Sequence, residues 1–253
     1  MRHYFTILSH EIRTLLCNAS TYVAAVLFLV VMGFMFSGLL DDYSKAPHET
    51  APAAVFFQVF WIPVFFMVPL LTMKSFAEER RLGTLETLLT TPVTTAEVVL
   101  GKFSAAYFFY ILLWGSTLGF HYVLSFYARD VRYLDSGPLI GGYLFIGVSG
   151  LLFIAIGILA STLTRSQAVA GILTFTLLLG LIGGFSYLNE LSFLNAEGLA
   201  PLKLAVETLR VPGHVEDFTN GIIDTRQVFF YLTGCILALL FSILGVEAKL
   251  LNS

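Results

Sequence analysis

Long apolar segments separated by short polar connections dominate the chain. Segments free of Asp, Glu, Lys and Arg cover residues 14–40, 50–73, 103–128, 136–164, 166–189 and 227–246. A helix crosses the hydrocarbon core of a bilayer in about 20 residues, so each segment is long enough to span it. None shows the apolar–polar alternation of a barrel strand, and helices satisfy their own backbone within lipid. The pattern predicts an all-α integral membrane protein with six transmembrane helices, at about residues 18–40, 54–74, 100–125, 138–161, 167–188 and 226–247.

Composition strengthens this interpretation. The chain is 57% hydrophobic and 12% charged, with a mean hydropathy of +0.83, whereas soluble domains carry roughly 25% charged residues. Its net charge of −3 and lack of a basic face argue against a nucleic-acid partner and leave membrane lipids as the expected surroundings. No linker divides the sequence, so we expect one transmembrane domain over residues 1–253. Cys17 and Cys235 lie at or inside apolar segments and are expected to be small buried side chains.

The N-terminal residues 1–17 alternate apolar and polar positions at helical spacing. The apolar positions are Phe5, Leu8, Ile12, Leu15 and Leu16. This spacing predicts an amphipathic helix lying at the membrane interface. The alternative is that these residues are the first polar turns of a longer transmembrane helix.

Basic residues predict the orientation of the chain. Lys74, Arg80, Arg81 and Lys102 flank a single connection at residues 74–102, while most acidic residues fall in the connections on the other side. Because Lys and Arg favour the cytoplasmic side, this connection is predicted to be cytoplasmic. Six spans then place both termini in the cytoplasm, and the expected location is the bacterial cytoplasmic membrane.

The external connection at residues 189–226 is long enough to hold structure of its own. Leu199, Leu202, Val206 and Leu209 fall at helical spacing. They predict a short amphipathic helix at the outer membrane face, between spans five and six. An ordinary solvated loop is the alternative.

The cytoplasmic connection at residues 74–102 contains clear helix-boundary signals. Capping-box spacing, a helix-interrupting glycine and a Thr-Pro pair occur at Ser75 with Glu78, Gly83, Thr91–Pro92, and Thr94 with Glu97. Thr94 and Glu97 precede a run of apolar residues and mark the start of the third span. A short helix is expected over residues 84–89, with its leucines on one side. Such a helix would dock on another protein or form a membrane-proximal elbow.

The run FAEERRLGTLETLLTTPVTTAEVVLGKF at residues 76–103 resembles the cytoplasmic loop of ABC-2 type transporter permeases, and most closely that of the gliding-motility-associated permeases. The six-span layout resembles that family as well. The resemblance implies a coupling helix that fits a cleft on a separate ATPase subunit, and a dimer of permeases around a translocation path. It also implies an external element near residues 199–220. Carried onto this chain, the ATPase-coupling residues are Glu78, Glu79, Arg80, Arg81, Thr84, Glu86, Leu88 and Leu89.

The chain has no phosphate-binding loop of its own. Its one Gly-Lys pair, Gly101–Lys102, is followed by Phe103, and Ala96 occupies the position of the first glycine of that motif. We therefore expect that this chain is not an enzyme and binds no cofactor or metal. ATP and Mg²⁺ would be bound by the partner ATPase, in two copies, beside a second identical or homologous permease.

Within the spans, prolines and a histidine are the residues that invite interpretation. Pro63 and Pro69 are expected to kink the second span, either as a hinge for alternating access or as a static bend. His121 is expected to be a packing or interface residue. The six apolar segments hold no acidic or basic side chains, which argues against an ion-coupled transporter.

Two glycine pairs within the spans have the spacing of closely packed membrane helices. They are Gly115 with Gly119 and Gly180 with Gly184. We expect them to pack helices within the bundle, and an interface between two copies is the alternative.

The leading functional hypothesis is a permease subunit of an ATP-binding-cassette exporter. A related complex that transmits ATP-driven motion to an envelope machine, without transport, is the alternative. An intramembrane enzyme is a weaker third hypothesis, because the spans contain neither H-E-x-x-H nor G-x-S-x-G.

Overall fold

The computed structural model describes residues 2–45, 50–84, 93–127, 135–190, 203 and 206–250. Helices are the regular elements of this part of the chain. They are α1 (Arg2–Cys17), α2 (Ala19–Lys45), α3 (Pro52–Gln58), α4 (Trp61–Thr72), α5 (Ala77–Leu82), α7 (Thr95–Ser116), α8 (Leu118–Tyr127), α9 (Ser136–Leu163), α10 (Gln167–Leu179), the π-helical η2 (Gly180–Gly184), α11 (Phe185–Glu190), α13 (Val211–Thr219) and α14 (Thr225–Leu250).

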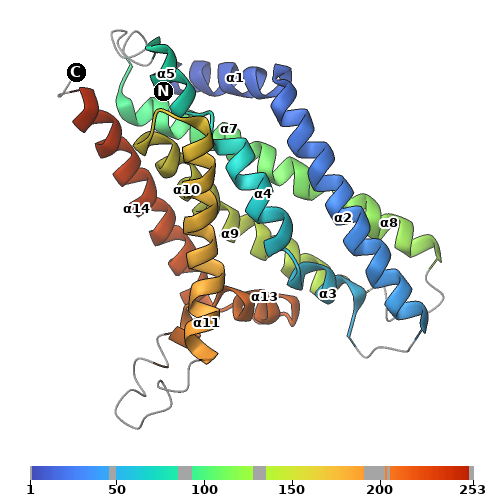
Figure 1. Cartoon of the computed structure of the whole chain (residues 1–253). Helices are drawn as coiled ribbons and strands as arrows, with labels where there is room; N and C mark the ends of the chain where they lie inside the picture. The colour runs from blue at the N-terminus through green and yellow to red at the C-terminus, as the bar shows by residue number, and fades with distance from the viewer. Residues whose placement is uncertain are drawn as a thin grey trace.

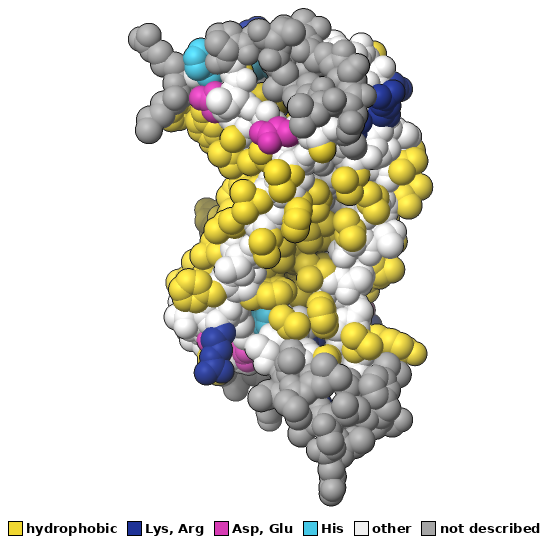
Figure 2. All heavy atoms as spheres, turned by 90° about the vertical axis from the view of Figure 1, so that its left-hand side faces the viewer, with side chains coloured by type: hydrophobic (Ala, Val, Ile, Leu, Met, Phe, Trp, Pro, Cys, Tyr) yellow, Lys and Arg dark blue, Asp and Glu magenta, His cyan; other side chains and the backbone are white. Residues whose placement is uncertain are grey.

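The prediction of an all-α integral membrane protein is confirmed. Five helical segments are long and apolar enough to cross a membrane: Ala19–Lys45, Thr95–Phe126, Ser136–Leu163, Gln167–Leu188 and Thr225–Ala248. The bent pair α3 and α4 makes a sixth if it is counted as one span. A band of apolar side chains covers the middle of the molecule, and the charged side chains lie toward its two ends (Figure 2).

The second span is broken, as its two prolines predicted. Helix α3 ends at Gln58 and the chain bends by 51° before α4 begins at Trp61. Pro63 is the third residue of α4, where a backbone N–H has no partner within the helix anyway, so proline costs little there. Pro69 lies inside α4 without ending it. The predicted kink is present, and it lies one turn before Pro63, whose missing N–H leaves the Val59 carbonyl with a bond from Ile62 only among the described residues.

Helix α9 is the centre of the bundle. It packs against α3, α4, α7, α10, α13 and α14. Glycines on α9 permit these close approaches: a Cβ at Gly142 would overlap the Phe57 ring, and one at Gly157 would overlap Thr72. A Cβ at Gly141 would overlap the Phe218 carbonyl of α13. Backbone and side chains of three neighbouring helices therefore reach the α9 backbone directly.

The two predicted glycine pairs do not have this role. A Cβ added at Gly115, Gly119, Gly180 or Gly184 would meet no atom of the described residues within 4 Å. Packing within the bundle was therefore the wrong interpretation for both pairs. Spacing in sequence cannot report which face of a helix turns inward.

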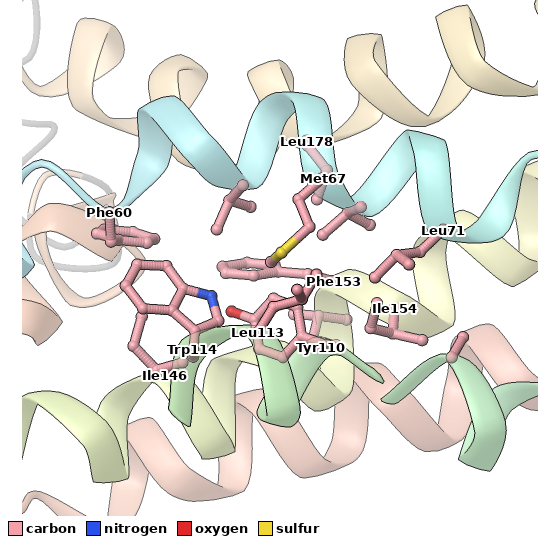
Figure 3. Packing of buried hydrophobic residues seen from close by; sticks show 14 of the residues in the cluster. Phe60, Met67, Leu71, Tyr110, Leu113, Trp114, Ile146, Phe153, Ile154 and Leu178 are labelled. Atoms are coloured by element: carbon pink, nitrogen blue, oxygen red, sulfur yellow. The ribbon is translucent and has the colours of Figure 1, made fainter. Parts of the chain in front are cut away.

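Aromatic and sulfur-bearing side chains fill the middle of the core (Figure 3). Trp114, Tyr110 and Phe153 are fully buried there together with Met67. The Trp114 and Tyr110 side chains point their polar atoms toward one another (Figure 3). His121 packs among aromatic rings, with its centroid 4.8 Å from that of Phe56, in agreement with the predicted packing role.

The two ends of the bundle differ in architecture. Helix α1 turns away from α2 and lies along the end that also holds α5 and both termini, as a separate helix of the kind predicted (Figure 1). Helix α13 crosses the opposite end (Figure 1). This helix covers residues 211–219, which follow the predicted external helix at 199–209. Of the predicted segment, residues 199–202 and 204–205 lie outside the described residues.

A buried junction joins four helices at one end of the bundle

Helix α1 is held on the first turns of α7 by side chains of one helical face. The Tyr4 hydroxyl donates a hydrogen bond to Ser104 Oγ at 2.9 Å. Ile7 lies so close to Gly101 that an added Cβ would come within 2.7 Å of its Cγ2. Glu11 lies one turn further along the same face, because residues four apart are neighbours on a helix. It reaches the next residue of α7, Lys102.

Lys102 is the electrostatic centre of this end. Its side chain is 3% exposed, and its Nζ lies 2.6 Å from Glu11 Oε1 of α1 and 2.6 Å from Glu79 Oε1 of α5. The same ammonium group lies 5.5 Å from the centre of the Phe76 ring. We call Glu11, Lys102 and Glu79 the Lys102 triad. One cation thereby joins α1, α5 and α7.

Burying the three charges of the triad costs desolvation free energy, and the triad serves to specify the positions of α1 and α5. Removing charges from water is unfavourable, and a buried ion pair often does no better than an apolar pair of the same size. Removing one partner destabilises the fold far more, because the remaining charges are left unpaired in a poorly solvated site. Glu79 Oε2 is already buried without a hydrogen-bond partner among the described residues. The triad therefore fixes where α1 and α5 sit, and it depends on all three members.

The beginning of α5 is capped by a side chain from the distant helix α9. The backbone N–H groups of Phe76 and Ala77 donate to Ser161 Oγ at 3.0 and 3.1 Å. The Ser161 hydroxyl in turn donates to the Met73 carbonyl at 3.3 Å. These bonds use the one donor and two acceptor sites of a hydroxyl. The predicted capping box of Ser75 and Glu78 was wrong, because α5 has Phe76 at its N-cap without a local side-chain cap.

Helix α5 is also fastened to α9 and ends in a glycine turn. Arg80 Nη1 donates to the Thr162 carbonyl at 2.7 Å. Gly83 follows α5 with φ of 71°, a left-handed conformation that glycine adopts without strain, and its N–H returns to the Glu79 carbonyl. The predicted interruption at Gly83 is therefore the C-cap of α5.

The outer side of α5 remains open. The side chain of Arg81 is 59% exposed and lies 3.9 Å from Glu78, which is 34% exposed. Leu82 is 63% exposed. An exposed leucine beside opposite charges at the end of an internally fastened helix is a surface suited to docking another protein.

Comparison with known families identifies the class of protein that carries this junction. The family model for "ABC-2 family transporter protein" matches residues 5–209 of the 253 residues, well over half of the chain. The chain belongs to the ABC-2 transporter family. No curated protein sequence matches it. The molecule is therefore a multi-pass membrane subunit of a transporter, and permeases of this family generally dimerise and work with an ABC ATPase subunit.

In this ABC-2 permease the predicted coupling residues divide into two groups. Glu79 and Arg80 point inward to Lys102 and to α9. Glu78 and Arg81 lie on the open side. Thr84 donates to the Glu79 carbonyl at 3.3 Å and is exposed. The remaining predicted residues, Glu86, Leu88, Leu89 and Pro92, lie outside the described residues.

The far end of the connection at residues 74–102 has the local structure expected from its sequence. Thr94 Oγ1 accepts from the Glu97 N–H at 3.3 Å, and the Glu97 carboxylate accepts from the Thr94 N–H at 3.2 Å. This reciprocal capping box begins α7.

Sequence reasoning missed the permease residues that bring the helices together. Lys102 looked like a boundary charge flanking the third span, Glu11 like a polar residue of an interfacial helix, and Ser161 like part of an apolar span. One weak indication of a buried ion pair was present in the sequence: Lys102 follows Gly101 and lies within the first turns of an apolar helix. A lysine at such a position needs a carboxylate partner, although the sequence does not say which one.

Proposed function

We propose that this chain is the permease subunit of an ATP-binding-cassette exporter, driven by a separate ATPase subunit through α5 and the loop that follows it. The single observation that carries the proposal is the two-sided character of α5. Its inner side is joined to α1, α7 and α9 by the Lys102 triad, Ser161 and Arg80. Its outer side exposes Arg81 and Leu82.

Such an element transmits force rather than merely marking the membrane boundary. A displacement of α5 by a docked subunit pulls on Lys102 through Glu79 and, from Lys102, on α1 through Glu11. It also pulls on α9 through the Ser161 and Arg80 hydrogen bonds. Because α9 contacts six other helices, its movement reaches the whole bundle.

ATP and Mg²⁺ belong to the partner in this proposal. The chain lacks a phosphate-binding loop, so the hydrolysis that supplies energy is assigned to the ATPase subunit. Two ATPase copies would act on two permeases, the second being identical or homologous. Since α5 and both chain termini lie at the same end of the bundle (Figure 1), ATPase binding at α5 places both termini in the cytoplasm of a bacterial cell. The proposed relatives are the gliding-motility-associated permeases.

Co-purification tests the proposal. The permease is tagged, expressed with its native ABC ATPases and purified in mild detergent, and the bound ATPase is quantified. The double variant Arg81→Glu with Leu82→Asp removes the open docking side of α5 without touching the triad. We expect it to lose most of the bound ATPase while keeping the melting temperature of the unmodified permease.

The matched control is Arg226→Glu, an exposed charge reversal at the start of α14 at the opposite end of the bundle. It should retain the ATPase. Unchanged ATPase association in the α5 double variant, or equal loss in the control, would rule out α5 as the docking element.

A further inference from the structure

A polar cavity of about 190 Å³ opens beside the Lys102 triad, between α1, α2, α4 and α5. Its polar lining includes Glu11, Asn18, Ser20, Lys74, Glu78 and Glu79. Leu15, Leu70 and Leu71 form an apolar part of the wall. A cavity with both kinds of wall, at the end of a transmembrane bundle, matches the place where lipid headgroups meet acyl chains.

The cavity carries a surplus of negative charge. Three carboxylates, of Glu11, Glu78 and Glu79, line it together with two ammonium groups, of Lys74 and Lys102, which leaves one negative charge in excess among the lining residues. Arg81 lies outside the lining, 3.9 Å from Glu78. Lys102 is shared between Glu11 and Glu79. Glu79 Oε2 is buried with no hydrogen-bond partner in the described part of the chain. The carboxylate open to a ligand is that of Glu78, whose side chain is 34% exposed, and a positively charged group with N–H donors suits it.

Lys74 places a positive charge on another wall of the cavity. Its Nζ donates to Ser20 Oγ at 2.6 Å and to Asn18 Oδ1 at 3.5 Å, both neutral groups. Within the described ranges no carboxylate lies at ion-pair distance from this ammonium, in contrast to Lys102. The Lys74 charge is therefore available to an anion, and a phosphate fits it well.

A shallow apolar crevice, with about 10 Å³ of free space, lies next to the cavity between α2 and α4. Leu70 lines both spaces, and the crevice extends along Ala24, Leu27 and Phe28 of α2 and Phe66 of α4. The Leu27 and Phe66 side chains are 42% and 51% exposed, so the crevice opens toward the lipid side of the bundle. A molecule with a zwitterionic head and a hydrocarbon chain would match the whole feature.

We propose that this feature binds one glycerophospholipid with an ammonium-bearing headgroup. Its phosphate lies on Lys74, its ammonium group lies among the carboxylates of Glu78 and Glu79, and one acyl chain lies over the crevice, along the exposed Leu27 and Phe66 side chains. The bound lipid adds a fifth component to the junction of α1, α5, α7 and α9. This site goes beyond the proposed transport function and does not require an ATPase subunit.

Native mass spectrometry of the purified permease alone tests the proposal. Phosphatidylethanolamine and phosphatidylglycerol with the same acyl chains are titrated separately. We expect preferential retention of phosphatidylethanolamine. Lys74→Met should weaken binding of both lipids by about tenfold, because it removes a charge-assisted contact to the shared phosphate. Glu78→Gln should abolish the preference while leaving phosphatidylglycerol binding intact.

Two controls make the outcomes decisive. Lys45→Met removes an exposed lysine at the other end of α2 and should change nothing. Lys74→Arg keeps the charge and should bind both lipids if Lys74→Met fails to fold. Equal retention of both lipids by the unmodified permease, or equal behaviour of the Lys74→Met and Lys45→Met variants, overturns the proposal. Binding of soluble glycerophosphoethanolamine as tightly as the lipid overturns the assignment of the crevice.

Discussion

The two ends of this bundle hold their helices together by different chemistry. At the junction end, a buried lysine is shared by two carboxylates on different helices. At the opposite end, α13 is held by contacts that, among the residues the structure describes, involve no buried lysine or arginine. Its His214 Nε2 lies 2.8 Å from the Thr208 carbonyl, and its Nδ1 lies 2.9 Å from the Tyr231 hydroxyl of α14.

This difference separates an element suited to transmitting movement from one suited to staying in place. The Phe218 carbonyl of α13 presses directly on Gly141 of α9, which leaves no room for sliding. Helix α5, in contrast, is buried at its start through Phe76 and Ala77 but is joined to α7 and α9 by long polar side chains and one hydroxyl. Long charged side chains reorient without repacking a core, so the junction can follow an applied displacement as a unit.

Removal of the shared lysine should give the largest effect. Lys102→Met strands Glu11 and Glu79 in a site built for a cation, and breaking such a buried network costs about 3–5 kcal/mol. We expect a much lower melting temperature of the detergent-solubilised permease, measured by fluorescence. Gln227→Met at the other end breaks only a hydrogen bond to Asp217 and should cost about 1 kcal/mol.

The same experiment has an internal rescue. Adding Glu11→Gln and Glu79→Gln to Lys102→Met removes the stranded charges and should restore most of the lost stability. A single Lys102→Met variant as stable as Gln227→Met would show that the triad does not organise this end.

Packing against α9 should give the next largest effect. Gly157→Ala forces a Cβ into Thr72 of α4, and overpacking of this kind costs about 1–3 kcal/mol. Gly38→Ala in α2 is the matched control, since its Cβ would meet no described atom within 4 Å. Alanine is the better helix former, so the control should gain stability slightly. Equal melting temperatures for the two variants would contradict the close approach of α4 to α9.

Loss of the inter-helix cap should have a moderate effect. Ser161→Ala leaves the N–H groups of Phe76 and Ala77 buried without their acceptor, which costs roughly 1–2 kcal/mol. Ser242→Ala removes a hydroxyl that bonds only within α14 and should cost less. Hydrogen exchange measured on the two variants should show faster exchange in α5 only for Ser161→Ala. Unchanged exchange there would argue against the cap.

Acidification should have the smallest effect, and it should act at the opposite end. Burial lowers the pKa of His214 below its ordinary value of 6.5, against a smaller opposing effect of the Thr208 carbonyl. Below pH 6.5 the unfolded chain takes up a proton that the folded protein resists, so stability is complete above this pH and declines as the pH falls. The decline should be a fraction of the roughly 1.4 kcal/mol per pH unit that one proton can contribute.

Melting temperatures between pH 7.5 and 5.5 measure this decline, with pH values chosen to bracket the ordinary histidine range. The variant His214→Gln can keep both hydrogen bonds but does not titrate. Its profile should be flatter over this range. A steeper profile for the variant would place the titrating group elsewhere.

The sequence predicted features that depend on neighbouring residues or on the overall hydrophobicity of a segment. Apolar length alone located the spans, because burial in lipid needs a fixed number of residues. The Thr94–Glu97 capping box formed because both partners lie within one helical turn. The Lys102 triad could not be predicted in the same way, because its members lie 91 and 23 residues apart. The fold decides which of several boundary acids meets the lysine.

The errors have the same cause. Ser75 and Glu78 had the right spacing for a cap, but Ser161 of α9 occupies that role in the folded chain. The glycine pairs had the right spacing for helix contact, yet the contacts of α9 use Gly141, Gly142 and Gly157 instead. Residue spacing indicates which side chains are able to cap or pack a helix, and tertiary packing determines which of them make the contact.

Site-specific photo-cross-linking in native membranes tests the central claim most directly. A photoreactive residue replaces Leu82 at the end of α5 or Ile222 at the opposite end, where the original side chains are 63% and 59% exposed. We expect a cross-link to an ABC ATPase from position 82 and none from position 222. A cross-link to the ATPase from position 222, with none from position 82, would contradict this claim.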